Sequence, residues 1–320
     1  MNYGDKGNEL YQQWLAMQTS QSEKRENEVD LIALWQVIWS EKWLVCTITF
    51  IFAISSVIYA LSLPNVYKSE ALLVPATEEQ NSLGGLASQF GGLASLAGVN
   101  LGGAGGIDKT NLAIEIIKSR IFITRFIEQN DLLIPLMATK GWDPQLNKLI
   151  YDSDAYNTKT GKWLRNGKGK PSAQEAYIAF RALVDISLDE KSSLIHLSVK
   201  HYSPYLAKEW VDELLYSINL EMKNRALSES EKSISYLKLQ LKQTNLKEIK
   251  NVLYQIIEEQ TKTIMFAEIR EQFAFKTIDP ALVPELKSGP KRAIICIAGT
   301  FLGGMLSVMI VLIRYVRKKK

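Results

Sequence analysis

The hydrophobic pattern of this 320-residue chain is dominated by two long apolar runs, one near each end. The first covers residues 43–63 and carries no charge, while the second covers 293–316 and carries only Arg314, near its end. A helix needs roughly 20 apolar residues to cross about 30 Å of hydrocarbon. We therefore expect two transmembrane helices in one bilayer, with the chain from Pro64 to Arg292 forming a single loop on one side of it.

The basic residues that flank the two runs predict which side that loop faces. Short Lys- and Arg-rich flanks stay in the cytoplasm, whereas long loops cross the membrane regardless of their charge. Residues 317–320 are all basic, and Lys24, Arg25 and Lys42 precede the first run. Both termini are therefore expected in the cytoplasm and the loop in the periplasm or outside the cell. A cleaved signal peptide is the alternative for the first run, but this run begins as late as Trp43 and no small-residue cleavage site follows it.

Residues 1–42 are expected to form a cytoplasmic tail that ends in an interfacial helix. The segment 1–28 is polar and without pattern, and apolar residues then recur at helical spacing from Asp30 to Trp39. Tryptophan side chains prefer the level of the lipid headgroups. This helix is expected to anchor the chain at the membrane surface before the first span, and contact with a partner is the alternative.

Residues 64–203 are expected to form an α/β base outside the membrane. Strand patterns occur between Pro64 and Pro75, with Val66 and Tyr67 at their start, and again at 183–188 and 193–201. In the last of these, Ile195, Leu197 and Val199 alternate with polar positions and should face the core. The remaining patterns predict an amphipathic helix over 109–129, an irregular insertion over 139–172 and a short helix over 172–181.

A glycine-rich segment, 83–106, interrupts the base. It holds nine glycines and no charge, with the sequence GGLAS beginning at both Gly84 and Gly91. A phosphate-binding loop is excluded because Asp108, not glycine, precedes Lys109. We expect a flexible or loosely helical segment that touches the membrane surface or a neighbouring subunit.

The stretch from Tyr205 to Asp279 contains no glycine and no proline and follows a helical apolar pattern. As one straight helix it would reach roughly 110 Å, yet the chain must return to the membrane by Ala293. An antiparallel helical hairpin over 204–275, with its turn near Thr244 and Asn245, satisfies both conditions.

The segment 276–292 is expected to bring the chain back to the membrane. It follows a strand pattern that begins at Phe275 and holds Pro280, Pro284 and Pro290, which stiffen the approach to the second span. Within the second span, Gly299 and Gly303 have the spacing that lets two helices approach closely. Glycine is also common in membrane helices generally, so association and mere composition remain equal alternatives here.

Composition removes several classes of function. The net charge is only +4, and no basic stripe with interleaved aromatic residues suggests nucleic-acid binding. Cys46 and Cys296 both lie in the apolar runs, so the loop has no disulfide. His196 and His201, the two histidines, are five residues apart on a predicted strand and should point to opposite faces. With no catalytic constellation, cofactor motif or metal motif, we expect a protein that is not an enzyme.

The layout resembles the Wzz-type polysaccharide chain-length determinants, or polysaccharide co-polymerases. The first run, its preceding Trp-rich helix and the LPNVYKSEALLVP sequence with Pro64, Tyr67 and Pro75 look like the family's N-terminal signature. Pro280, Pro284 and Pro290, followed by Lys291, Arg292 and the glycine-containing second run, look like its C-terminal signature.

The resemblance implies an inner-membrane protein of Gram-negative bacteria with a periplasmic α/β base and a long helical projection. It implies a homo-oligomer, without catalytic activity, that works with a Wzy-type polymerase. Together they would set the chain length of lipopolysaccharide O-antigen or a related glycan built on a polyprenyl carrier. The fold class expected is thus an α+β membrane protein, with two transmembrane helices that bracket the base and the helical hairpin.

Two other functions remain as alternatives. A sister branch of the family carries a fused cytoplasmic tyrosine kinase, and four residues after the second run leave no room for one here. The first alternative is therefore a capsule or exopolysaccharide export adaptor that works with a separate kinase. A two-span sensor is disfavoured because the sequence offers no cytoplasmic signalling domain to receive a signal.

Overall fold

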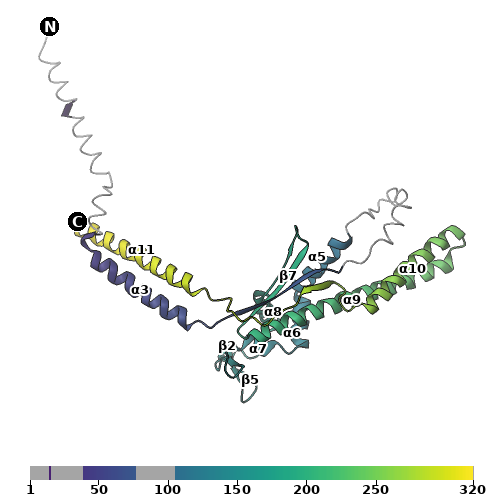
Figure 1. Ribbon diagram of the computed structural model, residues 1–320, viewed down its shortest axis with the longest axis horizontal. Coiled ribbons are helices and arrows are strands. Elements are labelled where there is room, and N and C mark those ends of the chain that lie inside the picture. Colours follow the sequence, from purple (N-terminus) through teal and green to yellow (C-terminus); the bar gives the residue numbers. More distant parts are fainter. Residues whose placement is uncertain (1–13, 16–38, 77–104, 320) are drawn as a thin grey trace, which may run out of the picture. The chain divides into compact units, whose positions relative to one another are not determined.

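The computed structural model describes residues 14–15, 39–76 and 105–319, in two compact units (Figure 1). One unit combines the chain up to Leu63 with the chain from Lys291 onward, and the other covers Pro64–Pro290. The interfacial helix expected between Asp30 and Trp39 and the glycine-rich segment 83–106 lie almost wholly outside the described residues.

The first unit is a pair of antiparallel helices, α3 (Lys42–Ser62) and α11 (Arg292–Lys319), that lie side by side (Figure 1). At one end Arg292 Nη2 donates to the carbonyl oxygen of Leu63 over 3.0 Å. At the other end Arg314 Nη1 lies 3.9 Å from Glu41 Oε2. Two polar contacts thus fix the ends of an otherwise apolar pair.

Both helices are long and apolar enough to cross a membrane, and most of their surface is exposed. Only 6% of the most apolar window of α3 and 17% of that of α11 is buried. Trp43 is 80% exposed, and Phe50 and Phe301 are about two thirds exposed. The core helix of a soluble protein would hide such side chains, whereas a lipid-facing helix presents them outward.

The second unit is built on a four-stranded antiparallel sheet in the order β6-β7-β1-β8. Its strands are β1 (Tyr67–Pro75), β6 (Val184–Asp189), β7 (Leu194–His201) and β8 (Phe275–Asp279). The strand that follows the first apolar helix therefore lies at the centre of the sheet, between two strands that come much later in the chain.

One face of the sheet carries the core. Ile195, Leu197 and Val199 are fully buried, which confirms the alternation predicted for β7. Ala71 and Leu73 of β1 pair opposite Leu197 and Ile195 on that face. Helix α9 packs on β1 and β7, and α8 packs on β6 and β7, so helices cover this side of the sheet.

The helices before β6 are α5 (Gly105–Lys118), α6 (Arg120–Gln129), α7 (Leu133–Met137) and α8 (Ala173–Leu183). The single helix expected over 109–129 is wrong. Ser119 has an extended backbone, and its hydroxyl accepts from the Phe122 N–H, so it caps a new helix. Because the helix is broken at Ser119, residues after it no longer share the apolar face of residues before it. Ile121, which a continuous helix would place on that face, is 71% exposed.

The insertion over 139–172 is more regular than its composition suggested. It forms two small antiparallel hairpins, β2 (Thr139–Asp143) with β3 (Lys148–Tyr151), and β4 (Tyr156–Asn157) with β5 (Lys162–Trp163). A short 3-10 turn, Arg165–Gly167, follows. Side chains of Asp143 and Asn157 accept backbone N–H groups in the two turns, which is how polar residues stabilise such short loops.

A long helical hairpin projects from the sheet (Figure 1). Helix α9 (Pro204–Gln243) has Ser203 as its N-cap and is about 60 Å long, and α10 (Lys247–Ile269) runs back along it. The connection consists of residues 244–246, so the predicted position of the turn is confirmed. The base-proximal part of α9 is buried, with Trp210, Leu214 and Ile218 fully covered.

Candidate membrane and assembly sites

The two glycines singled out in the second apolar run lie at the contact between α11 and α3. A Cβ on Gly303 would stand 2.5 Å from Phe52 Cβ, and one on Gly299 would overlap Ser56. Contacts this short do not occur between real carbon atoms, so each position excludes a side chain. The glycines let two helices of the same chain approach closely.

The neighbouring Gly304 faces outward instead. A Cβ there would meet nothing within 4 Å. It lines an open apolar groove of about 750 Å³ along the outer side of the helix pair, with Val45, Phe301, Met305 and Met309 around it. Thr300 also lines the groove, but its hydroxyl donates to Cys296 O, and the remaining lining is apolar, so the surface is suited to acyl chains or to another apolar helix.

In the second unit, the two chain ends that lead to the apolar helices are tied together. Val66 N donates to Gly289 O over 2.9 Å, and Ser288 N donates to Val66 O over 2.8 Å. Ser69 Oγ donates to Leu282 O over 2.7 Å further along the strand. Pro64 and Pro290 flank this clamp, and neither proline removes an N–H that the clamp uses.

Tyr67 stands at the first position of β1, where its ring meets Trp142 of the insertion edge to face at 5.7 Å. Trp142 in turn packs against Tyr205 at the start of α9. Tyr67 therefore joins the clamp at Val66 to the first hairpin of the insertion. The sequence identified Tyr67 but gave no sign of its aromatic neighbours, which lie 75 and 138 positions away along the chain.

Pro75 ends β1 opposite Phe275 of β8. Ala76 N donates to Ala274 O, which makes Pro75 and Phe275 a non-hydrogen-bonded pair whose own N–H and C=O groups point away from each other. A proline is tolerated there because its missing N–H would not have reached β8. Pro280 follows β8 and is exposed, while Pro284 is half-buried in the lead to the clamp.

The outward-pointing backbone groups of Phe275 are taken up by Asn219, a buried residue of α9. Asn219 Oδ1 accepts from Phe275 N over 3.0 Å and from Ala274 N over 2.7 Å. Asn219 Nδ2 donates to Phe275 O over 3.2 Å and to Leu215 O over 3.0 Å. One side chain thus fastens the returning strand to the projecting helix. Sequence reasoning missed it, although an asparagine among buried helical positions was a possible signal.

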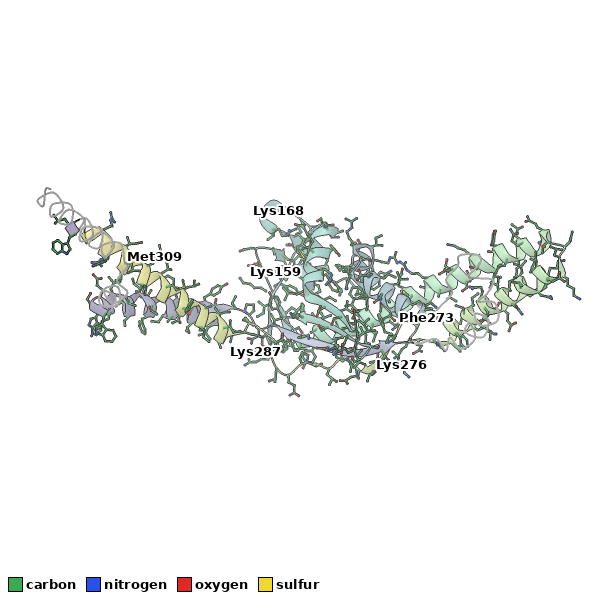
Figure 2. The ribbon with its side chains drawn as sticks, turned by 90° about the horizontal axis from the view of Figure 1, so that it is seen from above. Lys159, Lys168, Phe273, Lys276, Lys287 and Met309 are labelled. Carbon is green, nitrogen blue, oxygen red and sulfur yellow. The ribbon has the colours of Figure 1, made fainter. Side chains whose placement is uncertain are left out.

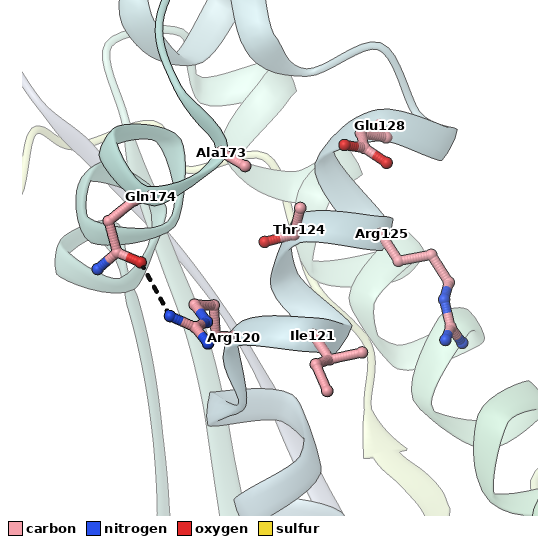
Figure 3. A pocket seen from close by; sticks show the side chains of 7 residues that line it. All are labelled: Arg120, Ile121, Thr124, Arg125, Glu128, Ala173 and Gln174. Atoms are coloured by element: carbon pink, nitrogen blue, oxygen red, sulfur yellow. Dashed lines mark hydrogen bonds between the residues drawn. The ribbon is translucent and has the colours of Figure 1, made fainter.

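A polar groove of about 530 Å³ lies between α6 and α8 (Figure 3). Arg120 points across it and its Nη1 donates to Gln174 Oε1 over 3.4 Å, while Thr124 and Glu128 line the adjoining wall. Arg125 at its edge is held by Glu221 of α9 at 3.0 Å. The lining contains no nucleophile next to a base; its guanidinium, amide and hydroxyl groups are suited to binding hydroxyl or carboxylate groups.

The titratable groups on the two faces of the sheet are hydrogen-bonded to neighbouring residues. Lys68 and His196 both hydrogen-bond Glu70 on the open face, and the Lys68 contact is the main cause that lowers the pKa of Glu70 from its usual 4.5. On the core side His201 contacts Pro135 O and the Ser203 N–H, and burial lowers its pKa below 6.5. Among the residues that the structure describes, no three His, Cys, Asp or Glu side chains form a group that could hold a metal.

The predicted residues therefore fall into separate places. Pro64, Tyr67 and Pro290 gather around the Val66–Gly289 clamp. Pro75 lies at the opposite end of β1. Gly299 and Gly303 belong to the helix pair, which is a unit of its own.

Comparison with known proteins gives one family match. The model described as "Wzz: Chain length determinant protein" matches residues 27–130, about a third of the chain. No curated protein matches the sequence significantly.

Two solved structures are similar over most of their length. A full-length bacterial polysaccharide co-polymerase is 12% identical with a TM-score of 0.38, covering 92% of this chain and 99% of its own. A fragment of WzzB, a polysaccharide co-polymerase from Salmonella Typhimurium, is 10% identical with a TM-score of 0.32, covering 70% and 100%. Both values are low, so the family assignment rests on the match within the sequence.

That match includes the first apolar run, Pro64, Tyr67 and Pro75, while the C-terminal signature lies beyond its end. Over residues 27–130 the chain is similar to the Wzz chain length determinant family, which confirms the N-terminal part of the resemblance predicted from the sequence.

Proposed function

We propose that the protein is a non-catalytic regulator of polysaccharide chain length in a bacterial inner membrane. It acts with a Wzy-type polymerase on a polyprenyl-linked glycan such as the lipopolysaccharide O-antigen. The family match over residues 27–130 is the observation that carries this proposal.

We propose that α3 and α11 span the membrane, with both termini in the cytoplasm and the second unit in the periplasm. Their outward apolar surfaces favour lipid contact, and the basic flanks favour this orientation. Cysteine labelling tests it in a Cys46→Ser, Cys296→Ser chain. A cysteine at the exposed Thr158 should react with a membrane-impermeant maleimide in intact spheroplasts, and one at Arg317 should react only after lysis. The reverse pattern would overturn the topology.

Assembly into a homo-oligomer is part of the proposal. Beyond the base, the hairpin exposes large apolar side chains on both helices, with Tyr236, Leu246 and Tyr254 each about 60% exposed. Exposed apolar surface of this extent commonly marks a protein interface. A second copy of the same hairpin would cover it and form the scaffold on which chain length is set.

The groove between α6 and α8 is where we expect the described residues to contact the growing glycan. A sugar offers hydroxyl groups, and in some glycans carboxylates, to Arg120 and Gln174. Arg120→Ala should then shift the modal chain length without removing the protein from the membrane. Lys191→Ala, at an exposed residue between β6 and β7, serves as the control for loss of a single positive charge.

The decisive experiment is the glycan ladder of cells that lack the protein. The modal band should disappear and return with the wild-type chain. Gly303→Leu, which collides with Phe52, should fail to restore it, whereas Gly304→Leu, which enters open space, should restore it. An unchanged ladder in the deletion strain refutes the proposed function. Loss of capsule with a normal ladder would favour the export adaptor instead.

A further inference from the structure

The insertion between α7 and α8, residues 139–172, concentrates positive charge on the second unit. It holds six lysines and one arginine against three aspartates, a net charge of +4. All six lysines are exposed: Lys140, Lys148, Lys159, Lys162, Lys168 and Lys170. Within the described residues the ion pair of this segment joins Arg165 to Glu175 of α8. The lysine charges are therefore available to an external partner.

Two of the three aspartates are used within the turns of the insertion. Asp143 Oδ1 accepts from the N–H groups of Gln145 and Leu146, and Asp152 Oδ1 accepts from Asp154 N. These two carboxylates are thus turned toward the backbone, while the six lysines are exposed. Lys159 and Lys168 are labelled at the edge of the base in Figure 2, away from the α9/α10 hairpin.

The same segment exposes apolar side chains beside its lysines. Leu146 at the tip of the first hairpin is 66% exposed, Ile150 is 51% exposed, and Leu164 is 44% exposed. Exposed leucine and isoleucine side chains among lysines are the composition of surfaces that insert shallowly into lipid headgroups.

The insertion is tied to the rest of the unit at both of its ends. Arg165 binds Glu175 through both nitrogens, at 2.6 and 3.2 Å, which together with the Ser172 N–H lowers the pKa of Glu175 to about 2. Tyr156 packs on Trp163 at 5.0 Å within the second hairpin. Trp142 of the first hairpin packs on Tyr67.

Tyr67 follows closely after Leu63, where the first proposed span has just ended. The four Cα–Cα steps from Leu63 to Tyr67 span at most about 14 Å when fully extended. The clamp between Val66 and Gly289 holds the lead to the second span at the same point. The covalent chain thus limits how far Tyr67, which packs on Trp142, can lie from the proposed membrane surface.

We propose that residues 139–172 form a second membrane contact, which docks its lysines on anionic lipid headgroups and its exposed Leu146 and Ile150 at their level. The inference rests on the proposed function in that α3 and α11 must span the bilayer. The contact would fix the orientation of the base relative to the membrane, which the two short leads alone would not do. Each lysine near an anionic surface contributes about a fivefold factor to the docked population.

The test places an environment-sensitive fluorophore at Leu146→Cys in the full-length Cys46→Ser, Cys296→Ser chain. The chain is reconstituted in nanodiscs of phosphatidylcholine alone or of phosphatidylcholine with phosphatidylglycerol. Emission should shift to the blue only with the anionic lipid, and the shift should be lost in molar salt, where screening acts within about 3 Å. Lys148→Glu, Lys159→Glu and Lys162→Glu together should reduce docking by at least about a hundredfold.

The control reverses two exposed lysines of the sheet that lie outside both the insertion and the hairpin, Lys191 and Lys276, and should leave the shift unchanged. Emission that is independent of lipid charge would overturn the inference. A shift that depends on the number of copies per disc would indicate contact with a second chain, and one that depends on added anionic glycan would indicate glycan binding. Either result would also overturn the inference. A chain that is extracted from membranes by alkaline carbonate would refute the proposed spans; a stably inserted chain with an insensitive label refutes only the docking surface.

Discussion

Asn219 is expected to hold the return strand of the base, and its replacement gives the sharpest prediction. Asn219→Ala removes the partners of Phe275 N, Phe275 O and Ala274 N. The two Phe275 groups point away from β1 and lie in a fully buried residue, whereas Ala274 is part-exposed and its N–H can turn to water. An unsatisfied buried backbone group costs about 1–3 kcal/mol. For the two Phe275 groups, the free energy that holds β8 in place should fall by about 3 kcal/mol, since small shifts of the strand recover part of the cost. The loss of the bond to Leu215 O is small because that carbonyl lies within a helix.

The effect should be local, since β8 is an edge strand. Hydrogen exchange of the full chain in nanodiscs measures it directly. A loss of about 3 kcal/mol corresponds to roughly a hundredfold faster exchange of the Phe275 amide. Asn219→Asp keeps the acceptor but loses the donor and introduces a buried charge, so it should be no better than alanine.

The matched control is Asn224→Ala, at an exposed asparagine of the same helix. It changes side-chain volume and helix propensity in the same way without touching β8. Equal exchange at Phe275 in the Asn219→Ala and Asn224→Ala chains would refute the reasoning. So would an accelerated exchange that extends equally to the central strand β1, because that would indicate global rather than edge-strand opening.

Two further predictions concern the helix pair and the core. Gly303→Leu should separate α3 from α11 and lower the thermal stability of the detergent-solubilised chain, whereas Gly304→Leu should leave it nearly unchanged; equal losses would contradict the close contact. Because burial lowers the pKa of His201 in the folded state, the unfolded chain binds more protons as the pH falls below about 6.5. Stability of the base should therefore decrease from pH 6.5 downward. This slope should vanish in His201→Gln and persist in His196→Gln, as followed by hydrogen exchange across that range.

Elements with a strong repeating pattern were predictable from the sequence. The alternation in β7 identified its buried face, and the polar stretch around Thr244 identified the hairpin turn. Both signals are local, because the period of a strand and the loss of a helical pattern are visible within a few residues.

The errors arose where a single residue overrides the pattern. Ser119 divides one amphipathic pattern into α5 and α6, because its hydroxyl caps the start of a new helix. The insertion was predicted to be irregular because its turns are made by Asp143 and Asn157 side chains, which leave only short runs for strands.

The candidate sites were predictable only in part, because they depend on long-range partners. Gly299 and Gly303 were identified by spacing, but the spacing does not say that α3 is the helix they meet. The pairing of Tyr67 with Trp142, and of Asn219 with Phe275, joins residues that are distant in the chain. Such pairs follow from the sheet order, which the local pattern does not encode.

Exposed apolar residues occur both on the α3/α11 pair and on the α9/α10 hairpin, yet the two surfaces need different partners. On α3 no charged residue interrupts residues 43–62, so lipid can cover it. On the distal half of α9, Lys232, Lys238 and Lys242 alternate with the apolar positions. Each lysine at the centre of a bilayer costs about 2.5–3.5 kcal/mol, so lipid cannot cover the hairpin. Its apolar side chains instead need a protein surface with polar groups at matching intervals, and in the proposed homo-oligomer a second copy of the same hairpin would supply it.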